Sequence, residues 1–451
     1  MRLFGTNGVR GVINQDLTPE LALRMGRAIG RIYGGTVALA TDTRCSADMM
    51  LSAASAGIRS AGASVRYIGM VPTPALQYYV KSHIDVSGGV MITASHNPPQ
   101  FNGIKCVSAD GTEAGRAEEE DIEKAYAEDL PCVPAEETGA YSTASGAGED
   151  YIDAVVSCID AAAVRKARLT VCLDCANGAS CRTSPLLLKN LGVRAITLNS
   201  DPQGEFPGRL SEPVEENLKE LMSLTRHSGA DLGIAHDGDA DRCVFVTGKG
   251  EFVSGDKSLA LIAGYILDAE KGTVVTPVST SSLVEDVVRS HGGAIEYTAV
   301  GSPVVSRRML ETKAVFGGEE NGGLIFPAMQ HCRDGAMSIA KMLEFVAVNG
   351  PLDKAVRTLP AYYIEKRKVE CSDKDKEAIA ATLEKRASAV EICKIDGLKL
   401  IFDDSWVLLR PSGTEPIYKI FAESRDASIA KARADEYVAL VRTILTDCHS
   451  Q

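Results

Sequence analysis

The sequence lacks both a long apolar run and an excess of positive charge. No stretch of the 451 residues approaches the ~20 apolar residues that a membrane-spanning helix needs. The formal charge is −12, from 48 basic and 60 acidic residues, whereas binding to a nucleic-acid backbone needs a basic face. We therefore expect neither a membrane nor a nucleic acid as a partner, and any anionic ligand must meet a local cluster of basic groups.

A secretion signal is also lacking. Met1-Arg2-Leu3-Phe4-Gly5 leads directly into a glycine-rich motif without the apolar core of a signal peptide, so we expect a cytoplasmic protein. The twelve cysteines are then expected to be reduced thiols. The spacing Cys172-Leu173-Asp174-Cys175 permits a metal or redox site. This segment reads as a buried strand, however, in which side chains three residues apart point to opposite faces, and that geometry disfavours a shared metal.

A pattern that is present three times predicts the fold. Each copy has an apolar strand, a polar or glycine-containing loop, an amphipathic helix, a glycine or small residue, and a second strand, which together form a βαβ unit. Crossovers of this length imply parallel pairing, so each copy is expected to build a mixed sheet covered by helices. The copies span Val37–Ala40, Ala47–Ser60 and Ala63–Ile68; Leu169–Leu173, a helix to Leu191 and Val193–Leu198; and Thr273–Thr276, a helix to Ser290 and Ala294–Thr298.

The pattern changes after about Ala361. A charged helix near Lys374–Ser388, three short β-rich runs and a last helix near Ala427–Leu445 predict a separate α+β domain. The Gly-, Ser- and Thr-rich segment Glu136–Gly148 is the best candidate for a linker. We therefore expect an α/β protein of four domains, at residues 1–145, 146–248, 249–360 and 361–451.

The first segment with chemical potential surrounds Ser95. In Met91-Ile92-Thr93-Ala94-Ser95-His96-Asn97-Pro98-Pro99 an apolar strand ends in a turn that exposes one serine. A serine hydrolase is disfavoured, because the G-x-S-x-G elbow is missing and the adjacent Ser95 and His96 cannot readily face each other as nucleophile and base. An ordinary polar turn remains an equal alternative for this segment alone.

The second segment places Asp237, Asp239 and Asp241 at alternate positions after an apolar strand. Such a cluster of oxygen ligands suits Mg²⁺, which keeps room in its shell for a phosphate oxygen. The spacing excludes a calcium EF-hand, because Arg242 and Gly248 stand where that loop needs glycine and glutamate. A solvated acidic turn is the alternative, but three aspartates without intervening bases repel one another unless a cation holds them.

Two further loops have ligand-binding character. Arg410-Pro411-Ser412-Gly413-Thr414-Glu415-Pro416 combines a guanidinium, two hydroxyls and a glycine that frees backbone N–H groups, which suits a phosphate and also describes a β-turn. Its spacing is not that of a nucleotide-binding P-loop. Gly317-Gly318-Glu319-Glu320-Asn321-Gly322-Gly323 carries carboxylates and an amide that can bind sugar hydroxyls, although alone it equally describes a solvated acidic turn.

These four loops, in this order, resemble those of the α-D-phosphohexomutase superfamily along the whole chain. The resemblance implies a heart-shaped fold of three related α/β domains and a fourth α+β domain, each lending one loop to a central cleft. It also implies an enzyme that moves a phosphoryl group between the 1 and 6 hydroxyls of a hexose through a hexose 1,6-bisphosphate. Hexose phosphates are then the ligands, hexose 1,6-bisphosphate the activator, and a monomer or homodimer the expected assembly.

The resemblance also implies roles for individual residues. Ser95 is the phosphoserine, and Ser95, Asp237, Asp239 and Asp241 hold Mg²⁺. Lys105, in Asn102-Gly103-Ile104-Lys105, serves in acid–base catalysis, which requires a pKa lowered by its pocket. The other implied residues are Arg10 and His96 at the phosphoserine, Arg242 beside the metal loop, Glu319 and Asn321 for the 3- and 4-hydroxyls, and Arg410, Ser412, Gly413 and Thr414 for the distal phosphate.

The sequence departs from the superfamily at the end of the sugar loop. Many members have Gly-His there, whereas this chain has Gly322-Gly323. His331 could replace the missing histidine, and a purely structural histidine is an equal alternative. The opening segment and the Arg-Pro-Ser-Gly-Thr-Glu-Pro loop resemble phosphoglucosamine mutases, and phosphomannomutases and phosphoglucomutases share much of both. A sugar phosphatase and a non-catalytic sugar-phosphate-binding protein are the alternatives of another class.

Overall fold

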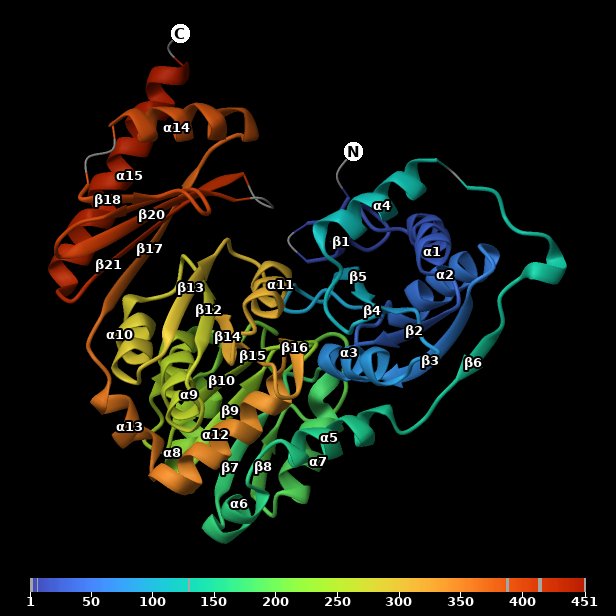
Figure 1. The fold of residues 1–451 in the computed structure, drawn as a ribbon, viewed down its shortest axis with the longest axis horizontal. Coiled ribbons are helices and arrows are strands. Elements are labelled where there is room, and N and C mark those ends of the chain that lie inside the picture. Colours follow the sequence, from blue (N-terminus) through green and yellow to red (C-terminus); the bar gives the residue numbers. More distant parts are fainter. Residues whose placement is uncertain (1–2, 6, 129, 387–388, 413–415, 450–451) are drawn as a thin grey trace.

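Four β-sheets follow one another along the chain, each with helices packed against it (Figure 1). The computed structural model describes all residues except 1–2, 6, 129, 387–388, 413–415 and 450–451. We call the four sheets with their helices the N-terminal, second, third and C-terminal units. In Figure 1 the N-terminal unit lies on one side of the third unit and the C-terminal unit on another.

The N-terminal and second units contain mixed sheets. The elements of the N-terminal unit are β1 (Val9–Val12), α1 (Pro19–Tyr33), β2 (Thr36–Thr41), α2 (Ala47–Ser60), β3 (Ser64–Met70), α3 (Thr73–Ser82), β4 (Gly88–Ile92), β5 (Phe101–Ser108), α4 (Arg116–Ala127), η1 (Ala135–Glu137) and β6 (Tyr141–Thr143). Those of the second unit are α5 (Ala147–Ser157), α6 (Ala161–Ala167), β7 (Thr170–Asp174), η2 (Ala179–Cys181), α7 (Thr183–Asn190), β8 (Arg194–Leu198), η3 (Glu215–Asn217), α8 (Lys219–Ser228), β9 (Leu232–His236), β10 (Cys243–Thr247) and β11 (Phe252–Val253).

The third unit repeats this design and the C-terminal unit does not. The elements of the third unit are α9 (Gly255–Ala269), β12 (Thr273–Pro277), α10 (Ser282–Ser290), β13 (Ala294–Thr298), α11 (Ser302–Thr312), β14 (Phe316–Glu319), β15 (Gly323–Phe326), β16 (Gln330–Arg333), α12 (Gly335–Asn349) and α13 (Leu352–Thr358). The C-terminal unit has β17 (Tyr363–Glu370), α14 (Asp373–Arg386), β18 (Glu391–Cys393), β19 (Leu398–Ile401), β20 (Ser405–Pro411), β21 (Ile417–Ser424) and α15 (Ala427–His449), and its sheet is entirely antiparallel.

The first three sheets share one topology. In each, a central strand pairs in parallel with the strand that follows its crossover helix and with a third strand, and that third strand turns back into an antiparallel partner. The returning pairs are β4–β5, β9–β10 and β14–β15. The loops of Ser95, of the three aspartates and of Glu319 are these three turns. The threefold βαβ repeat of the sequence is thus confirmed, and it puts three of the four loops at equivalent positions.

Local sequence signals account for the elements of the first repeat. The hydroxyl of Thr18 accepts a hydrogen bond from the backbone N–H of Leu21, and Pro19 occupies the first turn of α1, where its missing N–H costs nothing. The strand β2 is almost completely buried, because its apolar side chains face helices on both sides of a parallel sheet.

The strands β6 and β17 were not expected from the sequence. β6 lies inside the proposed linker and pairs in parallel with β3 as the edge of the N-terminal sheet, so part of that segment belongs to a sheet. The C-terminal unit has five strands where three β-rich runs were expected, and its edge strand β17 pairs with β21 along eight residues. Both are edge strands with exposed polar side chains, which weaken the apolar pattern of a strand.

The apolar core is continuous through the first three units. One cluster of buried side chains includes Met91, Leu173 and Val274, which belong to three different sheets, whereas the C-terminal unit has a core of its own. A smaller cluster of Val278, Trp406 and Leu408 joins the third and C-terminal units. The first three units therefore form one block, to which the C-terminal unit is attached.

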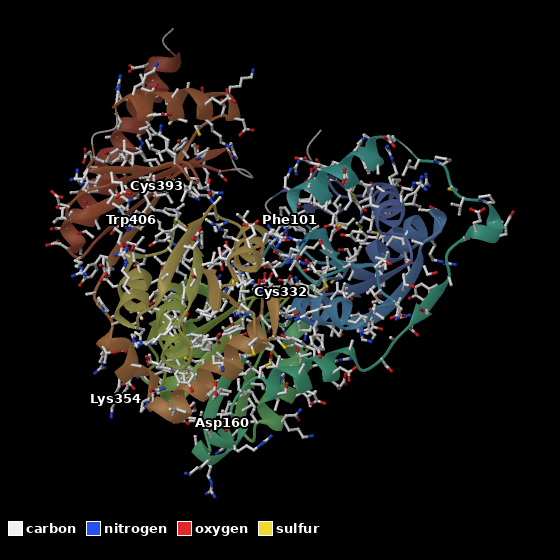
Figure 2. The ribbon with its side chains drawn as sticks, viewed as in Figure 1. Phe101, Asp160, Cys332, Lys354, Cys393 and Trp406 are labelled. Atoms are coloured by element: carbon white, nitrogen blue, oxygen red, sulfur yellow. The ribbon has the colours of Figure 1, made fainter. Side chains whose placement is uncertain are left out.

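Trp406 stands at the centre of this attachment, where the C-terminal sheet faces the third unit (Figure 2). Its indole N–H donates hydrogen bonds to Glu423 Oε1 at 2.7 Å and to Ser282 Oγ at 3.0 Å. The Lys399 ammonium lies 4.1 Å from the centre of the indole ring. The contact between the units is thus both apolar and polar.

Within the described residues, no helix has the length and apolar character required to cross a membrane.

Candidate active site

Ser95 stands in a strained turn after β4. Its backbone has φ +52°, in the left-handed region that few residues other than glycine adopt. The Thr93 hydroxyl stabilises the turn, since it accepts a hydrogen bond from Ser95 N at 2.9 Å and donates one to Asp42 Oδ2 at 2.6 Å. The side chain of Ser95 is turned inward, and the residue is only 1% exposed. Strain of this kind is maintained only where the surrounding structure fixes it.

The buried guanidinium of Arg44 stabilises the serine turn through hydrogen bonds to its backbone. Its two terminal nitrogens donate to the carbonyl oxygens of Ser95 and Asn97 at 3.0 and 2.6 Å, and to those of Pro98 and Phe101, both at 2.7 Å. Its Nε pairs with the buried Asp42 carboxylate at 3.1 Å. One cation from the loop after β2 thus fixes the backbone that carries Ser95.

The aspartate loop approaches Ser95 from the second unit. Ser95 Oγ donates to Asp237 Oδ2 at 2.8 Å, and Arg242 Nε donates to the same oxygen at 3.0 Å. Gly238 permits this contact, because a Cβ atom there would lie 2.5 Å from the carbonyl oxygen of Ser95. His96 Nδ1 is farther from the serine hydroxyl, at 3.4 Å. The nearest acceptor for Ser95 is therefore a carboxylate.

The other two aspartates share Lys105 of β5. Lys105 Nζ donates to Asp239 Oδ2 at 2.6 Å and to Asp241 Oδ2 at 3.2 Å, and Thr73 Oγ1 donates to Asp239 at 2.6 Å. All three aspartates of the loop are buried, and one oxygen from each lies within 4.8 Å of the others.

Two oxygens of this group lack a hydrogen-bond donor. Asp239 Oδ1 and Asp241 Oδ1 are buried and accept no hydrogen bond from any described residue. Unpaired buried carboxylate oxygens are costly unless a cation compensates them. Three converging carboxylates with unpaired oxygens therefore fit a hard divalent cation that prefers oxygen ligands.

The protonation of Lys105 differs from the expectation. Burial alone lowers the pKa of its ammonium, but the charges of Asp239 and Asp241 outweigh burial and raise the pKa above its usual value. The expected lowering is therefore wrong for this arrangement. Lys105 is an ammonium ion, which can donate a proton or stabilise negative charge.

The neighbouring groups respond to burial in opposite ways. Burial raises the pKa of Asp237 to about 6, although the Arg242 charge opposes the rise. Burial, together with the charges of Arg242 and Arg10, lowers the pKa of His96 to about 2, so its imidazole is neutral. Arg10 itself donates to Asn97 Oδ1 at 3.0 Å and to the carbonyl oxygen of Ala94 at 3.3 Å, which places it beside the serine turn.

The sugar loop between β14 and β15 lies next to the aspartates. Glu319 is buried; its Oε1 accepts from Gly301 N at 3.1 Å, and its Oε2 accepts from Arg333 Nη1 at 3.0 Å. Arg333 Nη2 donates to Asp241 Oδ2 at 2.6 Å. Asn321 is exposed, and its side-chain oxygen accepts from Gly323 N at 3.1 Å. Arg333 thus connects the sugar loop to the aspartate loop.

A buried carboxylate near Glu320 of the sugar loop yields a prediction. Asp256, in the first turn of α9, accepts a hydrogen bond from Ser281 N at 2.9 Å, and burial, reinforced by the charge of Glu320, raises its pKa to about 7. The unfolded chain releases this proton near pH 4, so the contribution of Asp256 to stability falls as the pH rises from about 4 to about 7, and the loss stays constant above that.

Replacing Asp256 by asparagine is therefore expected to stabilise the protein by about 1–3 kcal/mol at about pH 8, and by less at about pH 5. Urea unfolding at both pH values measures the difference. Asp121→Asn on the exposed face of α4 is the control and should change little at either pH. A gain that is equal at both pH values would contradict the origin in ionisation.

The remaining residues of the expected site lie farther from the aspartates. His331 of β16 is half-buried; burial lowers the pKa of its imidazole, and its charged neighbours are Lys81 and Asp110. Cys332 in Figure 2 marks this strand, at the boundary between the third and N-terminal units. The structure thus places His331 at that boundary, and among the described residues its imidazole makes no hydrogen bond to Ser95.

The expected phosphate loop belongs to the C-terminal unit. The Arg410 Nε atom pairs with Asp396 at 2.7 Å, and the same carboxylate accepts from Val300 N of the third unit at 2.9 Å. Ser412 is buried, and its carbonyl oxygen accepts from Lys376 Nζ at 2.6 Å. Gly413 and Thr414 lie outside the described residues.

Four contributors to the site were not found in the sequence: Arg44, Thr73, Glu113 and Arg333. The order Gln330-His331-Cys332-Arg333-Asp334 drew attention to the histidine, but the arginine two residues later makes the contacts. A charged residue at the end of an otherwise buried strand was the available signal for Arg333.

Comparisons with known proteins agree with this arrangement. Models of the phosphoglucomutase/phosphomannomutase α/β/α domains I, II and III match residues 1–131, 149–250 and 254–363, and the model of the C-terminal domain matches residues 367–440. A phosphoglucomutase/phosphomannomutase of Thermococcus kodakarensis is 40% identical, with 97% of each chain covered. A probable phosphoglucosamine mutase of Methanopyrus kandleri is 41% identical, with 98% of each covered.

A solved structure shows the same fold. The phosphoglucomutase/phosphomannomutase family protein of Burkholderia thailandensis superimposes with a TM-score of 0.88 at 26% identity, covering 98% of this chain and 97% of the other. The expected architecture of three related α/β domains and a C-terminal domain is thereby confirmed. The chain therefore belongs to the phosphoglucomutase/phosphomannomutase family and is a phosphohexomutase.

Proposed function

We propose that this protein interconverts hexose 6-phosphate and hexose 1-phosphate through a phosphoserine at Ser95 and a bound hexose 1,6-bisphosphate. The observation that carries the proposal is the hydrogen bond of Ser95 Oγ to Asp237, at 2.8 Å, inside a buried group of carboxylates. A serine whose nearest partner is a cation-binding carboxylate suits phosphoryl transfer. Acyl transfer would need a histidine base in that place.

The aspartate loop is the proposed Mg²⁺ site. Asp237, Asp239 and Asp241 would hold the ion, with Ser95 Oγ beside it. When bound, Mg²⁺ neutralises charge on the phosphoryl group in transfer. The unpaired oxygens of Asp239 and Asp241 support this assignment.

The chain's own groups account for the remaining steps. In the first transfer the bond from phosphorus to Ser95 Oγ breaks, a bond from phosphorus to a hexose oxygen forms, and the proton of the hexose hydroxyl ends on Ser95 Oγ. The freed hydroxyl can then donate to Asp237, as it does in this structure. Lys105, an ammonium ion beside the aspartates, is placed to stabilise negative charge on the reacting oxygens.

The second transfer runs in the opposite sense with the other phosphate of the bisphosphate. The intermediate must therefore bind in two orientations. We assign its hydroxyls to Glu319 and Asn321, and its distal phosphate to Arg410 and Ser412 together with Gly413 and Thr414. A guanidinium is well suited to a phosphate because it donates two parallel hydrogen bonds.

Glucosamine phosphate is the proposed sugar, and glucose or mannose phosphate is the second candidate. The name of the Methanopyrus kandleri relative supports the first, and that of the Thermococcus kodakarensis relative supports the second. The two sugar classes differ at carbon 2, where an ammonium replaces a hydroxyl. Discrimination between them therefore needs a direct comparison of rates.

The test is turnover of glucosamine 6-phosphate, glucose 1-phosphate and mannose 1-phosphate with Mg²⁺ and a catalytic amount of the matching 1,6-bisphosphate. We expect isomerised sugar phosphate, with the highest kcat/KM for the glucosamine compound. Free phosphate in excess of isomerised sugar would show a phosphatase instead. Binding without turnover of any of the three sugars would show a sugar-phosphate-binding protein.

A further inference from the structure

Arg333 lies where three units of the protein meet. Its guanidinium donates to Asp241 of the second unit at 2.6 Å and to Glu319 of the third unit at 3.0 Å, and it lies 3.9 Å from Glu113 of the N-terminal unit. Asp241 belongs to the proposed cation site and Glu319 to the proposed sugar site. One buried cation therefore touches both.

The contacts on the N-terminal side reinforce this position. Glu113 accepts hydrogen bonds from Asn7 Nδ2 and from the hydroxyl of Ser302, which begins α11. Ser302 follows Gly301, whose N–H donates to Glu319. Glu113 and one oxygen of Glu319 thus have partners other than Arg333, whereas the second oxygen of Glu319, Oε2, accepts its hydrogen bond from the guanidinium.

Because Gly323 has no side chain, the side chain of Arg333 can pass beside it to reach the carboxylates. A Cβ atom on Gly323 would lie 2.2 Å from Arg333 Cδ and 3.0 Å from its Cγ. Any side chain at position 323 would displace the arginine from its present course. Gly323, which has no Cβ atom, therefore leaves the room that the side chain of Arg333 occupies.

We propose that Arg333 is a positioning residue that couples the cation site to the sugar site, and that Gly323 is required for it. The inference rests on the proposed roles of Asp241 and Glu319. Arg333 neutralises part of the Asp241 charge and so opposes the binding of a cation, while its planar fork aligns Glu319 for the sugar hydroxyls. Loss of Arg333 should consequently strengthen cation binding and weaken turnover, two effects of opposite sign.

The experiment measures Mn²⁺ binding by electron paramagnetic resonance, without sugar, together with steady-state kinetics on the best sugar phosphate. For Arg333→Gln we expect the Kd for Mn²⁺ to fall about threefold or more, because a positive charge has been removed near the ligands. We expect kcat/KM to fall on the order of 100-fold, because Glu319 loses its alignment. Arg333→Lys keeps the charge but lacks the fork, so its Mn²⁺ affinity should match wild type while kcat/KM stays at least about tenfold lower.

Gly323→Ala tests the second part of the proposal. Its Cβ should displace Arg333, so that both changes seen in Arg333→Gln reappear. Gly115→Ala is the matched control, because the nearest atom to its Cβ would lie 3.6 Å away, at ordinary van der Waals distance. Thermal unfolding of each variant verifies that it is folded.

Three results would overturn the inference. Weaker Mn²⁺ binding in Arg333→Gln alongside its lower turnover would show that the arginine merely supports the fold of the aspartate loop. Unchanged turnover in that variant would remove the link to Glu319. If wild-type protein bound no Mn²⁺ or isomerised no hexose phosphate, the proposed function would fail first, and the inference with it.

Discussion

Replacement of Ser95 by alanine is expected to abolish isomerisation of hexose phosphates, lowering kcat on the order of 10⁴-fold or more. The reason is covalent, because among the residues that the structure describes only the Ser95 hydroxyl donates to Asp237. The Thr73 hydroxyl also contacts an aspartate, but it donates to Asp239 Oδ2 at 2.6 Å, the oxygen that Lys105 also contacts. The fold should survive, because the substitution removes one hydrogen bond and keeps the backbone of the turn.

Two measurements check this result. The rate with the preferred sugar phosphate gives the loss of turnover, and intact-protein mass after incubation with hexose 1,6-bisphosphate gives phosphorylation. Wild type should gain the mass of one phosphoryl group, and Ser95→Ala should gain none. Ser258→Ala is the matched control, since Ser258 is also a buried serine but donates only to the backbone carbonyl oxygens of Ser254 and Gly255 at the start of α9. Isomerisation that persists in Ser95→Ala would rule out the phosphoserine mechanism.

The second large effect is expected at Arg44, which touches no reacting atom. Arg44→Met should destabilise the protein by about 3–5 kcal/mol, because Asp42 would become a buried charge without its partner. Four carbonyl oxygens of the serine turn would each lose one hydrogen-bond donor at the same time. Since the turn positions Ser95, kcat should fall on the order of 100-fold even where the variant is fully folded.

Urea unfolding and turnover of the folded fraction separate the two consequences. Arg59→Met is the control, because Arg59 lies on the neighbouring helix α2 and donates to a single carbonyl oxygen, that of Gly139 at 2.9 Å. Its effect should stay below about 1 kcal/mol. Full turnover in folded Arg44→Met would show that the position of Ser95 does not depend on the hydrogen bonds of Arg44.

The βαβ repeat and the loops could be predicted from the sequence, because each is marked by a pattern of neighbouring residues. The βαβ repeat is visible because apolar strands and amphipathic helices alternate at regular intervals, and the loops are visible because each interrupts that pattern with unusual polar residues. β17 was not predicted, because Tyr363–Glu370 carries Lys and Arg at several positions and is half exposed as an edge strand. β6 was not predicted, because three exposed residues are too few to show the apolar pattern of a strand.

The charge state of the site could not be read from the sequence. The protonation of Lys105 depends on Asp239 and Asp241, which are more than 130 residues away in the chain and belong to another unit. Arg44 and Arg333 are likewise ordinary arginines until the fold places carbonyl oxygens and carboxylates around them. Interactions between units decide these properties, and no local pattern contains them.

The contact around Trp406 gives the protein an internal optical reporter. Trp406 is the only tryptophan in the sequence, it is buried, and its indole N–H is bound to Glu423 and Ser282. Indole emission shifts to longer wavelength when the ring is exposed to water. Any separation of the C-terminal sheet from the third unit would therefore change the colour of the emitted light, so that the movement can be followed in unlabelled protein in real time.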